Sequence, residues 1–332
     1  MYINEYGNQN NPKLIVLAPM MVISTYMSKA ETVIRKGYLH CGYMSAHRKE
    51  YVEELEGFIG GKQWERRTAM DKINITGVPE TMLQTLYARA IYSKRPEHKF
   101  YDAKAVEIIS CIDYDFTNAG KDALMSNGVI ARTILLDHMV DDFIRENPDG
   151  TVVNIACGLD MRCYRLDNGK IRWYNLDLPE TIEIRRRFVQ EDGRFSMIAK
   201  SAIDESWASE IEAQGKILVV IEGLTMYLSE SDVQKILSII TDKPWQAEII
   251  METMSPFVVK HIKEKSIDAA QAKFTWGVKS GKELERFSPA IRWIKDVSLA
   301  EGMVQMMPAY KLVAWIPAIR NISNKLTILK TF

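Results

Sequence analysis

The chain has 332 residues, of which 47% are apolar and 26% charged, so it has the composition of a soluble globular protein with a sizeable core. Its formal net charge is zero, which gives it no overall basic field to hold nucleic acid or an anionic membrane. Four cysteines without a C-x-x-C pair, and an N-terminus without the basic and apolar stretches of a secretory signal, predict a cytoplasmic protein.

The first 67 residues differ in character from the rest of the chain. Lys13 to Ala18 is typical of a short strand, and Glu50 to Phe58 has the composition of a helix. Gly60-Gly61 then gives a plausible boundary. We therefore predict an N-terminal extension over residues 1–67 and a larger domain over residues 68–332.

The larger domain begins with helical patterns and then alternates strand and helix. Apolar residues recur at helical spacing over Val78 to Tyr92, Ala103 to Cys111 and Ile130 to Ile144. The later alternation predicts an α/β fold with a mostly parallel sheet covered on both faces. The expected strands are 152–156, 172–176, 195–199, 217–222, 247–252, 292–299 and 325–330, with later helices at 257–274 and 310–319.

The stretch from Thr151 to Asp177 is the centre of this pattern. A buried strand turns at Cys157-Gly158, and Asp177 ends the next strand nineteen residues after Gly158, where an acid can accept hydrogen bonds from a ribose. A dinucleotide loop needs three glycines, but Ala156 and Met161 stand in place of two of them. The amino-acid tail of S-adenosylmethionine needs the backbone to come close at only one position, which Gly158 can provide. An ordinary strand–helix crossover is the alternative, and a Rossmann oxidoreductase would need the missing glycines.

Several ordered motifs carry a family resemblance. NIACGLDMRCYRL (154–166) resembles the G-x-G-x-D-T-R-x-x-R-L loop of the leucine carboxyl methyltransferase family, which includes polyketide carboxyl O-methyltransferases. The segments YNLDLPETIEIRR, SAIDESW and VIEGLTMYLSESDV are similar to later motifs of that family, and the resemblance runs from about Met82 to the C-terminus. It implies a class I methyltransferase with a Rossmann-like, seven-stranded, mostly parallel sheet, a helical cap and S-adenosyl-L-methionine as cofactor.

The resemblance also implies the residues of the cofactor site. Arg132 would pair with the carboxylate of the cofactor's methionine half, because a planar guanidinium matches a carboxylate. That role predicts that the ligand, and not the core, is its partner. Asp204 either belongs to the motif beside the adenine or caps the following helix. The expected cofactor contacts are Arg89, Arg132, Ala156, Gly158, Asp160, Asp177, Leu178, Ser201, Ala202, Glu222 and Gly223.

Other polar and aromatic residues receive structural or substrate roles. We expect Arg162 and Arg165 to be partly structural, and the Arg185-Arg186-Arg187 run to form a solvated helix face. No histidines, cysteines and carboxylates have metal-ligand spacing, so no metal is expected. The aromatic residues Tyr87, Tyr92, Phe274 and Trp276 either line a substrate pocket or form the core of the cap.

The predicted activity is methyl transfer to a carboxylate, or another acidic oxygen, of a small-molecule substrate. A carboxylate is already ionised near neutral pH and needs no strong base, whereas a phenol or alcohol would need one. Glu222, Tyr227 and His138 are the candidates for such a group. The alternatives are methylation of a protein C-terminus and a non-catalytic, nucleotide-binding Rossmann-like protein. No nucleic-acid or membrane partner is expected.

Overall fold

A computed structural model of the chain describes residues 80–112, 114–117, 123–261 and 273–332. The chain divides into two units, Met1–Met70 and Asp71–Phe332, and every described residue belongs to the second. The strand predicted at 13–18 and the helix predicted at 50–58 lie outside the described residues. In the described part of the chain, no helix has the length and apolar character needed to cross a membrane.

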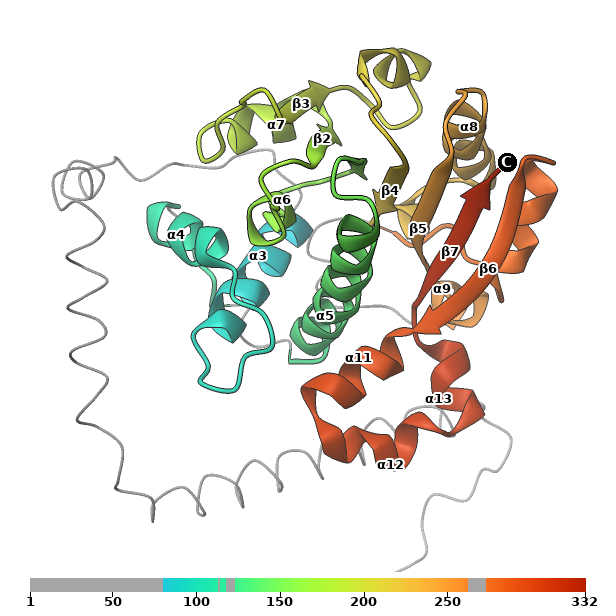
Figure 1. Cartoon of the computed structure of the whole chain (residues 1–332). Coiled ribbons are helices and arrows are strands. Elements are labelled where there is room, and N and C mark those ends of the chain that lie inside the picture. The colour runs from blue at the N-terminus through green and yellow to red at the C-terminus, as the bar shows by residue number, and fades with distance from the viewer. Residues whose placement is uncertain (1–79, 113, 118–122, 262–272) are drawn as a thin grey trace, which may run out of the picture. The chain divides into compact units, whose positions relative to one another are not determined.

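The second unit is built on one seven-stranded sheet, with the strand order β3-β2-β1-β4-β5-β7-β6 (Figure 1). The pairs β2–β3, β1–β2, β1–β4 and β4–β5 are parallel, and β7 is antiparallel to both of its neighbours. The predicted mostly parallel sheet is therefore confirmed. The strands are β1 (Thr151–Ile155), β2 (Arg172–Asp177), β3 (Phe195–Ala199), β4 (Ile217–Ile221), β5 (Ala247–Thr253), β6 (Ile291–Ser298) and β7 (Lys325–Thr331).

Helices precede, connect and extend this sheet. Among the described residues, the α-helices are α3 (Glu80–Ser93), α4 (Ala103–Cys111), α5 (Ala123–Glu146), α6 (Arg162–Arg165), α7 (Pro179–Arg185), α8 (Glu230–Thr241), α9 (Pro256–His261), α11 (Leu299–Met306), α12 (Lys311–Ala314) and α13 (Pro317–Ile322). Short 3₁₀ helices are η3 (Glu205–Glu210), η4 (Thr225–Tyr227), η5 (Gly281–Phe287) and η6 (Pro308–Tyr310).

The central strands are apolar on both faces because both faces are covered. Every residue of β1 and β4 is buried. Along β4, Val219 packs in one apolar cluster with residues of α8, while Leu218 and Val220 pack in another with residues of α5. This two-sided burial is the usual reason that parallel strands are continuously hydrophobic.

The predicted helix at 310–319 is wrong as a single element. The chain forms η6, α12 and α13 there, and Pro317 stands at the first turn of α13. Proline lacks the N–H that a continuous helix requires, so it begins a helix more readily than it continues one. Helix α11 directly follows β6 and was not predicted as a helix.

Candidate functional site

Three of the predicted motifs meet at the carboxyl ends of the parallel strands. Ile155, at the end of β1, is in register with Leu176 of β2 on one side and Ile221 of β4 on the other. The residues that follow these parallel strands therefore emerge side by side. The structure thus brings together the turn at Ala156–Gly158, the Asp177-Leu178 pair and the Glu222-Gly223 pair, at the edge where open α/β sheets bind ligands.

The turn after β1 is held by hydrogen bonds to the end of β2. Ala156 and Gly158 both have left-handed backbones, with φ angles of 55° and 48°. The Gly158 N–H donates to Asp177 Oδ2 at 2.7 Å, and the Leu178 N–H donates to Asp177 Oδ1 at 2.8 Å. Burial raises the pKa of Asp177 although both hydrogen bonds favour its charged form. The two backbone N–H groups thus fix the orientation of both carboxylate oxygens.

Arg132 of α5 lies between two carboxylates at the ends of β4 and β5. Its Nε is 2.7 Å from Glu222 Oε1, and its Nη1 donates to Glu252 Oε2 at 2.8 Å. Burial opposes the charge of Arg132, but these two acids raise its pKa above the usual value. The prediction that Arg132 has no partner in the protein core is therefore wrong. The buried Nε–H is not directed along a hydrogen bond, and no hydrogen bond joins Nη2 to another described residue.

Arg162 of α6 extends this cluster toward α5. Its side chain is 1% exposed and donates to Asp137 Oδ1 at 2.7 Å, Asp160 Oδ2 at 2.7 Å and Glu222 Oε2 at 3.0 Å. Burial opposes ionisation of all three acids, but the arginines around them lower each pKa. Arg165 joins the same cluster through Asp137 and Asp160. The expectation that these two arginines are structural agrees with their burial and pairing.

Known proteins match most of the described chain. The profile of the family described as Leucine carboxyl methyltransferase matches residues 82–241. The Tetracenomycin polyketide synthesis O-methyltransferase TcmP of Streptomyces glaucescens is 32% identical over 234 residues, which are 70% of this chain and 87% of the relative. The chain belongs to the leucine carboxyl methyltransferase family.

A second relative supports the same class of enzyme. The S-adenosyl-L-methionine-dependent methyltransferase dpfgK of Gibberella zeae is 28% identical over 246 residues, which are 67% of this chain and 82% of the relative. A solved structure of a SAM-dependent methyltransferase from Anabaena variabilis has a TM-score of 0.42 at 12% identity, covering 80% of this chain and 99% of that chain. By its family and these two relatives, the chain is therefore an S-adenosylmethionine-dependent methyltransferase.

Arg185 of the methyltransferase corrects a prediction. The predicted solvated face is wrong for this residue, which is fully buried and donates to the carbonyls of Gly158 at 2.9 Å and Asp160 at 2.6 Å. Arg186 and Arg187 are exposed, as expected. A signal was present in the sequence, because Arg185 shares the helical spacing of the buried residues Ile182 and Val189. Arg185 therefore supports the turn after β1 through these two hydrogen bonds.

Two further predicted contacts have partners within the protein. Arg89 donates to Asp102 Oδ2 at 3.0 Å and to the Leu159 carbonyl at 2.8 Å, so it braces the loop after Gly158. Asp160 accepts from Arg162 and from Asn154 Nδ2, the latter at 3.3 Å. Contacts of Arg89 and Asp160 with the cofactor remain predictions.

The loop after β3 resolves one of the alternatives left by the sequence. Asp204 precedes η3, and its side chain accepts from the Ser206 N–H at 2.9 Å, as an N-cap does. Ser201 and Ala202 are partly buried nearby in the chain. Leu178 and Ile203 are 43% and 38% exposed, which is unusual for large apolar residues beside a polar site. Ile203 was not predicted.

The aromatic residues mostly form core. Tyr92, Phe274 and Trp276 are buried in three different apolar clusters, so a shared substrate pocket is the wrong interpretation for them. Tyr87 is half-buried and stacks on Phe116, with ring centroids 4.9 Å apart. It is the member of the set that keeps both interpretations open.

The candidate bases differ from one another in environment. His138 is exposed, although its neighbour Asp137 points into the ion-pair cluster. Tyr227 belongs to η4 and lies 5.6 Å from Phe274, between ring centroids. Their catalytic roles remain predictions.

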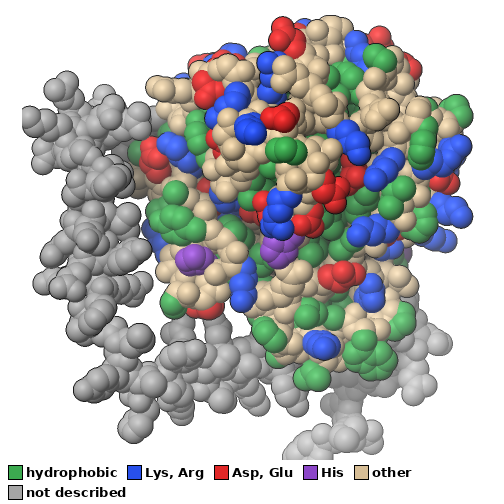
Figure 2. All heavy atoms as spheres, viewed as in Figure 1, with side chains coloured by type: hydrophobic (Ala, Val, Ile, Leu, Met, Phe, Trp, Pro, Cys, Tyr) green, Lys and Arg blue, Asp and Glu red, His purple; other side chains and the backbone are tan. Residues whose placement is uncertain are grey.

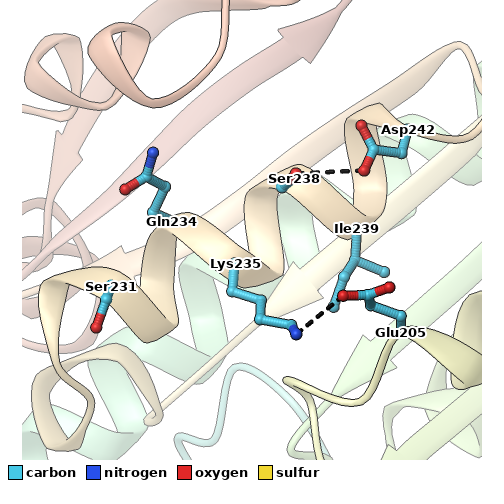
Figure 3. Close-up of a pocket in the computed structure, with 7 residues that line it drawn as sticks. All are labelled: Glu205, Ser231, Gln234, Lys235, Ser238, Ile239 and Asp242. Carbon is cyan, nitrogen blue, oxygen red and sulfur yellow. Dashed lines mark hydrogen bonds and ion pairs between the residues drawn. The ribbon is translucent and has the colours of Figure 1, made fainter.

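A separate depression of about 320 Å³ lies along α8 and η3 (Figure 3). Its charged side chains have partners among the lining residues, since Lys235 lies 2.9 Å from Glu205 and Ser238 donates to Asp242 at 3.3 Å. None of its lining residues belongs to the cluster at the strand ends. On the face of the molecule drawn in Figure 2, side chains of both charge signs are interspersed.

Proposed function

We propose that this methyltransferase transfers a methyl group to the carboxylate of a small-molecule acid. The observation that carries the proposal is the state of Glu222. Its Oε1 lies 2.7 Å from Arg132 Nε and its Oε2 accepts from Arg162 Nη2 at 3.0 Å. Burial opposes its charge, but these arginines lower the pKa of Glu222 below the usual value. Such a carboxylate is a weak base, so an acceptor that is already ionised suits the site better than a phenol or alcohol.

The residues at the strand ends fit S-adenosylmethionine. Asp177 is fixed by two backbone N–H groups and would accept hydrogen bonds from the ribose. The exposed Leu178 and Ile203 would cover the adenine, which accounts for apolar side chains left open to solvent. Arg132 would bind the amino-acid carboxylate through Nη2. When bound, the cofactor supplies an electrophilic methyl group on its sulfonium.

Helix α3 encloses the turn that would face the cofactor's amino-acid tail. A Cβ at Gly158 would lie 3.2 Å from Met82 Cγ, a tight contact, and the φ angle of 48° favours glycine at this position. A carboxylate acceptor has no proton to lose, so the task of the chain is to bind and align two ligands. Alignment alone can contribute roughly 7–11 kcal/mol to catalysis.

Matched acceptors test this proposal. The full chain is incubated with S-adenosylmethionine and either an aromatic carboxylic acid or the alcohol or phenol with the same ring system, and products are followed by mass spectrometry. We expect methyl esters of acids and no methyl ethers. Methylation of the phenol but not the acid would contradict the proposal.

The protein-substrate alternative needs its own acceptor. A peptide that ends in a leucine carboxylate is tested beside the small acids. The printed name of the Streptomyces glaucescens relative, which refers to polyketide synthesis, favours a small molecule. Methylation of the peptide without methylation of any small acid would favour the alternative.

A further inference from the structure

Glu252 is a buried carboxylate at the carboxyl end of β5 that sequence analysis did not identify. It is 1% exposed, and its Oε2 accepts from Arg132 Nη1 and from the Gly223 N–H, both at 2.8 Å. Its Oε1 accepts from Asn324 Nδ2 at 2.9 Å, and its main-chain carbonyl accepts from Thr225 Oγ1 at 2.6 Å. One residue thus connects α5, the turn after β4 and the residue that precedes β7.

These contacts fix the guanidinium of Arg132 on one side. Burial of a carboxylate costs several kcal/mol unless its oxygens are paired, and both oxygens of Glu252 are paired with described residues. Gly223 has a φ angle of 65°, and a Cβ there would lie 3.6 Å from Arg132 Nη1. The same carboxylate therefore holds the arginine and the turn against which it lies.

The remaining donors of Arg132 define what this arrangement is for. Nη1 is taken by Glu252, and Nε lies beside Glu222 at 2.7 Å without a directed hydrogen bond. Nη2 makes no hydrogen bond to another described residue. We infer that Glu252, supported by Asn324, is a positioning residue that holds Arg132 so that Nη2 binds the carboxylate of the cofactor. The inference rests on the proposed cofactor role of Arg132.

A double-mutant cycle on ligand affinity tests the inference, with Glu252→Gln and Arg132→Ala as its two changes. Glutamine keeps the shape of Glu252 and an acceptor for Gly223, and it can pair with a reoriented Asn324 amide, but it loses the charge that holds Arg132. Affinity for S-adenosylhomocysteine is measured by titration calorimetry. We expect Glu252→Gln to weaken binding about tenfold in the wild-type background and less than about twofold in the Arg132→Ala background.

Kinetic constants and a control on the same strand separate positioning from general damage. With S-adenosylmethionine as the varied substrate, Glu252→Gln should raise KM more than it lowers kcat, because the acceptor site is unchanged. Glu248→Gln is the control, since Glu248 also lies on β5 but pairs with Lys330 at 3.3 Å on a partly exposed surface. It should change neither constant.

Each result supports or overturns one specific statement. Equal losses of affinity in both backgrounds, or no loss in the wild-type background, would overturn the role of Glu252. An Arg132→Ala variant with unchanged affinity would instead overturn the proposed cofactor contact of Arg132. If Glu252→Gln does not fold, Asn324→Ala replaces it in the cycle, with an expected loss of about threefold that again requires Arg132. Arg132→Lys replaces Arg132→Ala on the same grounds.

Discussion

The two halves of the site are built in different ways. At the ends of β1 and β2, the turn is formed by backbone, with left-handed residues at 156 and 158 and an N–H of Gly158 bound to an acid nineteen residues away. At the ends of β4 and β5, side chains of opposite charge pair although they are distant in sequence. Arg162 and Glu222 are 60 residues apart in the chain, and Arg132 and Glu252 are 120 apart. Ala156 stores backbone strain in the first half, whereas the second half contains most of the buried charges; the exception is Arg185, which donates to carbonyls and does not pair with an acid.

Their carboxylates also respond to burial in opposite ways. Burial raises the pKa of Asp177, and the hydrogen bonds from Gly158 and Leu178 together with the charge of Arg185 oppose this only in part. In the charged half, arginines overcome burial and lower the pKa values of Asp137 and Glu222. The charged half is therefore compensated by the protein itself. The turn half keeps an undercompensated acceptor, which suits hydrogen bonds from a ligand's hydroxyl groups.

Removal of Arg162 should have the largest effect on the charged half. Arg162→Met leaves Asp137, Asp160 and Glu222 without their shared partner, so we expect a loss of about 3–5 kcal/mol in the free energy of unfolding. Urea denaturation measures it. Arg187→Met is the control, because the exposed Arg187–Glu183 pair at 3.5 Å should contribute less than about 1 kcal/mol. Similar losses in both variants would contradict a special role for the charged half.

Acid should weaken the same half progressively. Asp137, Asp160 and Glu222 have lower pKa values in the folded chain than the ordinary 3.8 and 4.5, so the unfolded chain takes up protons first as the pH falls. Their contribution to stability is complete above these ordinary values and is lost as the pH falls through the window below them. The expected slope is about 1.4 kcal/mol per pH unit for each proton. Unfolding free energies that stay constant from neutral pH to below pH 3.8 would exclude this behaviour.

Asp177→Ala should weaken ligand binding as well as folding, because Asp177 also accepts from the Gly158 and Leu178 N–H groups. It removes the proposed acceptor for the ribose, so affinity for S-adenosylhomocysteine should fall by about 1.5–3 kcal/mol, as measured by calorimetry. Asp204→Ala is the matched variant. Since Asp204 caps η3, its removal should lower the melting temperature slightly and leave affinity unchanged. An affinity loss at Asp204 and none at Asp177 would reverse the assignment of the two acids.

The smallest expected effect tests backbone strain in the turn half. Ala156 has a φ angle of 55°, which costs a residue with a Cβ about 1–2 kcal/mol, while glycine adopts it freely but loses more entropy on folding. Ala156→Gly should therefore raise the free energy of unfolding by up to about 1 kcal/mol. Thermal denaturation measures the change. Ala199→Gly is the control, because Ala199 lies in the extended strand β3, and it should lower the melting temperature. If Ala156→Gly also lowers the melting temperature, position 156 is not strained.

Local patterns in the sequence were enough to predict the sheet and the position of the turn half. Periodicity and spacing were enough to predict the apolar strands β1 and β4, the turn at Gly158 and the acid at Asp177. These features are set by residues that lie close together in the chain. The predicted helix at 310–319 was wrong because Pro317, a local signal, begins the new helix α13.

The pairing in the charged half follows from the folded structure and not from any local pattern. The sequence indicated Arg132 and Glu222, but not that they pair with each other, nor that Glu252 and Asn324 complete the cluster. The helical spacing of Arg185 indicated its burial, but not its partners, the carbonyls of Gly158 and Asp160 in the loop after β1. A buried charge is tolerated only when its partners converge on it, and those partners come from elements that are distant in sequence. No local pattern records that convergence.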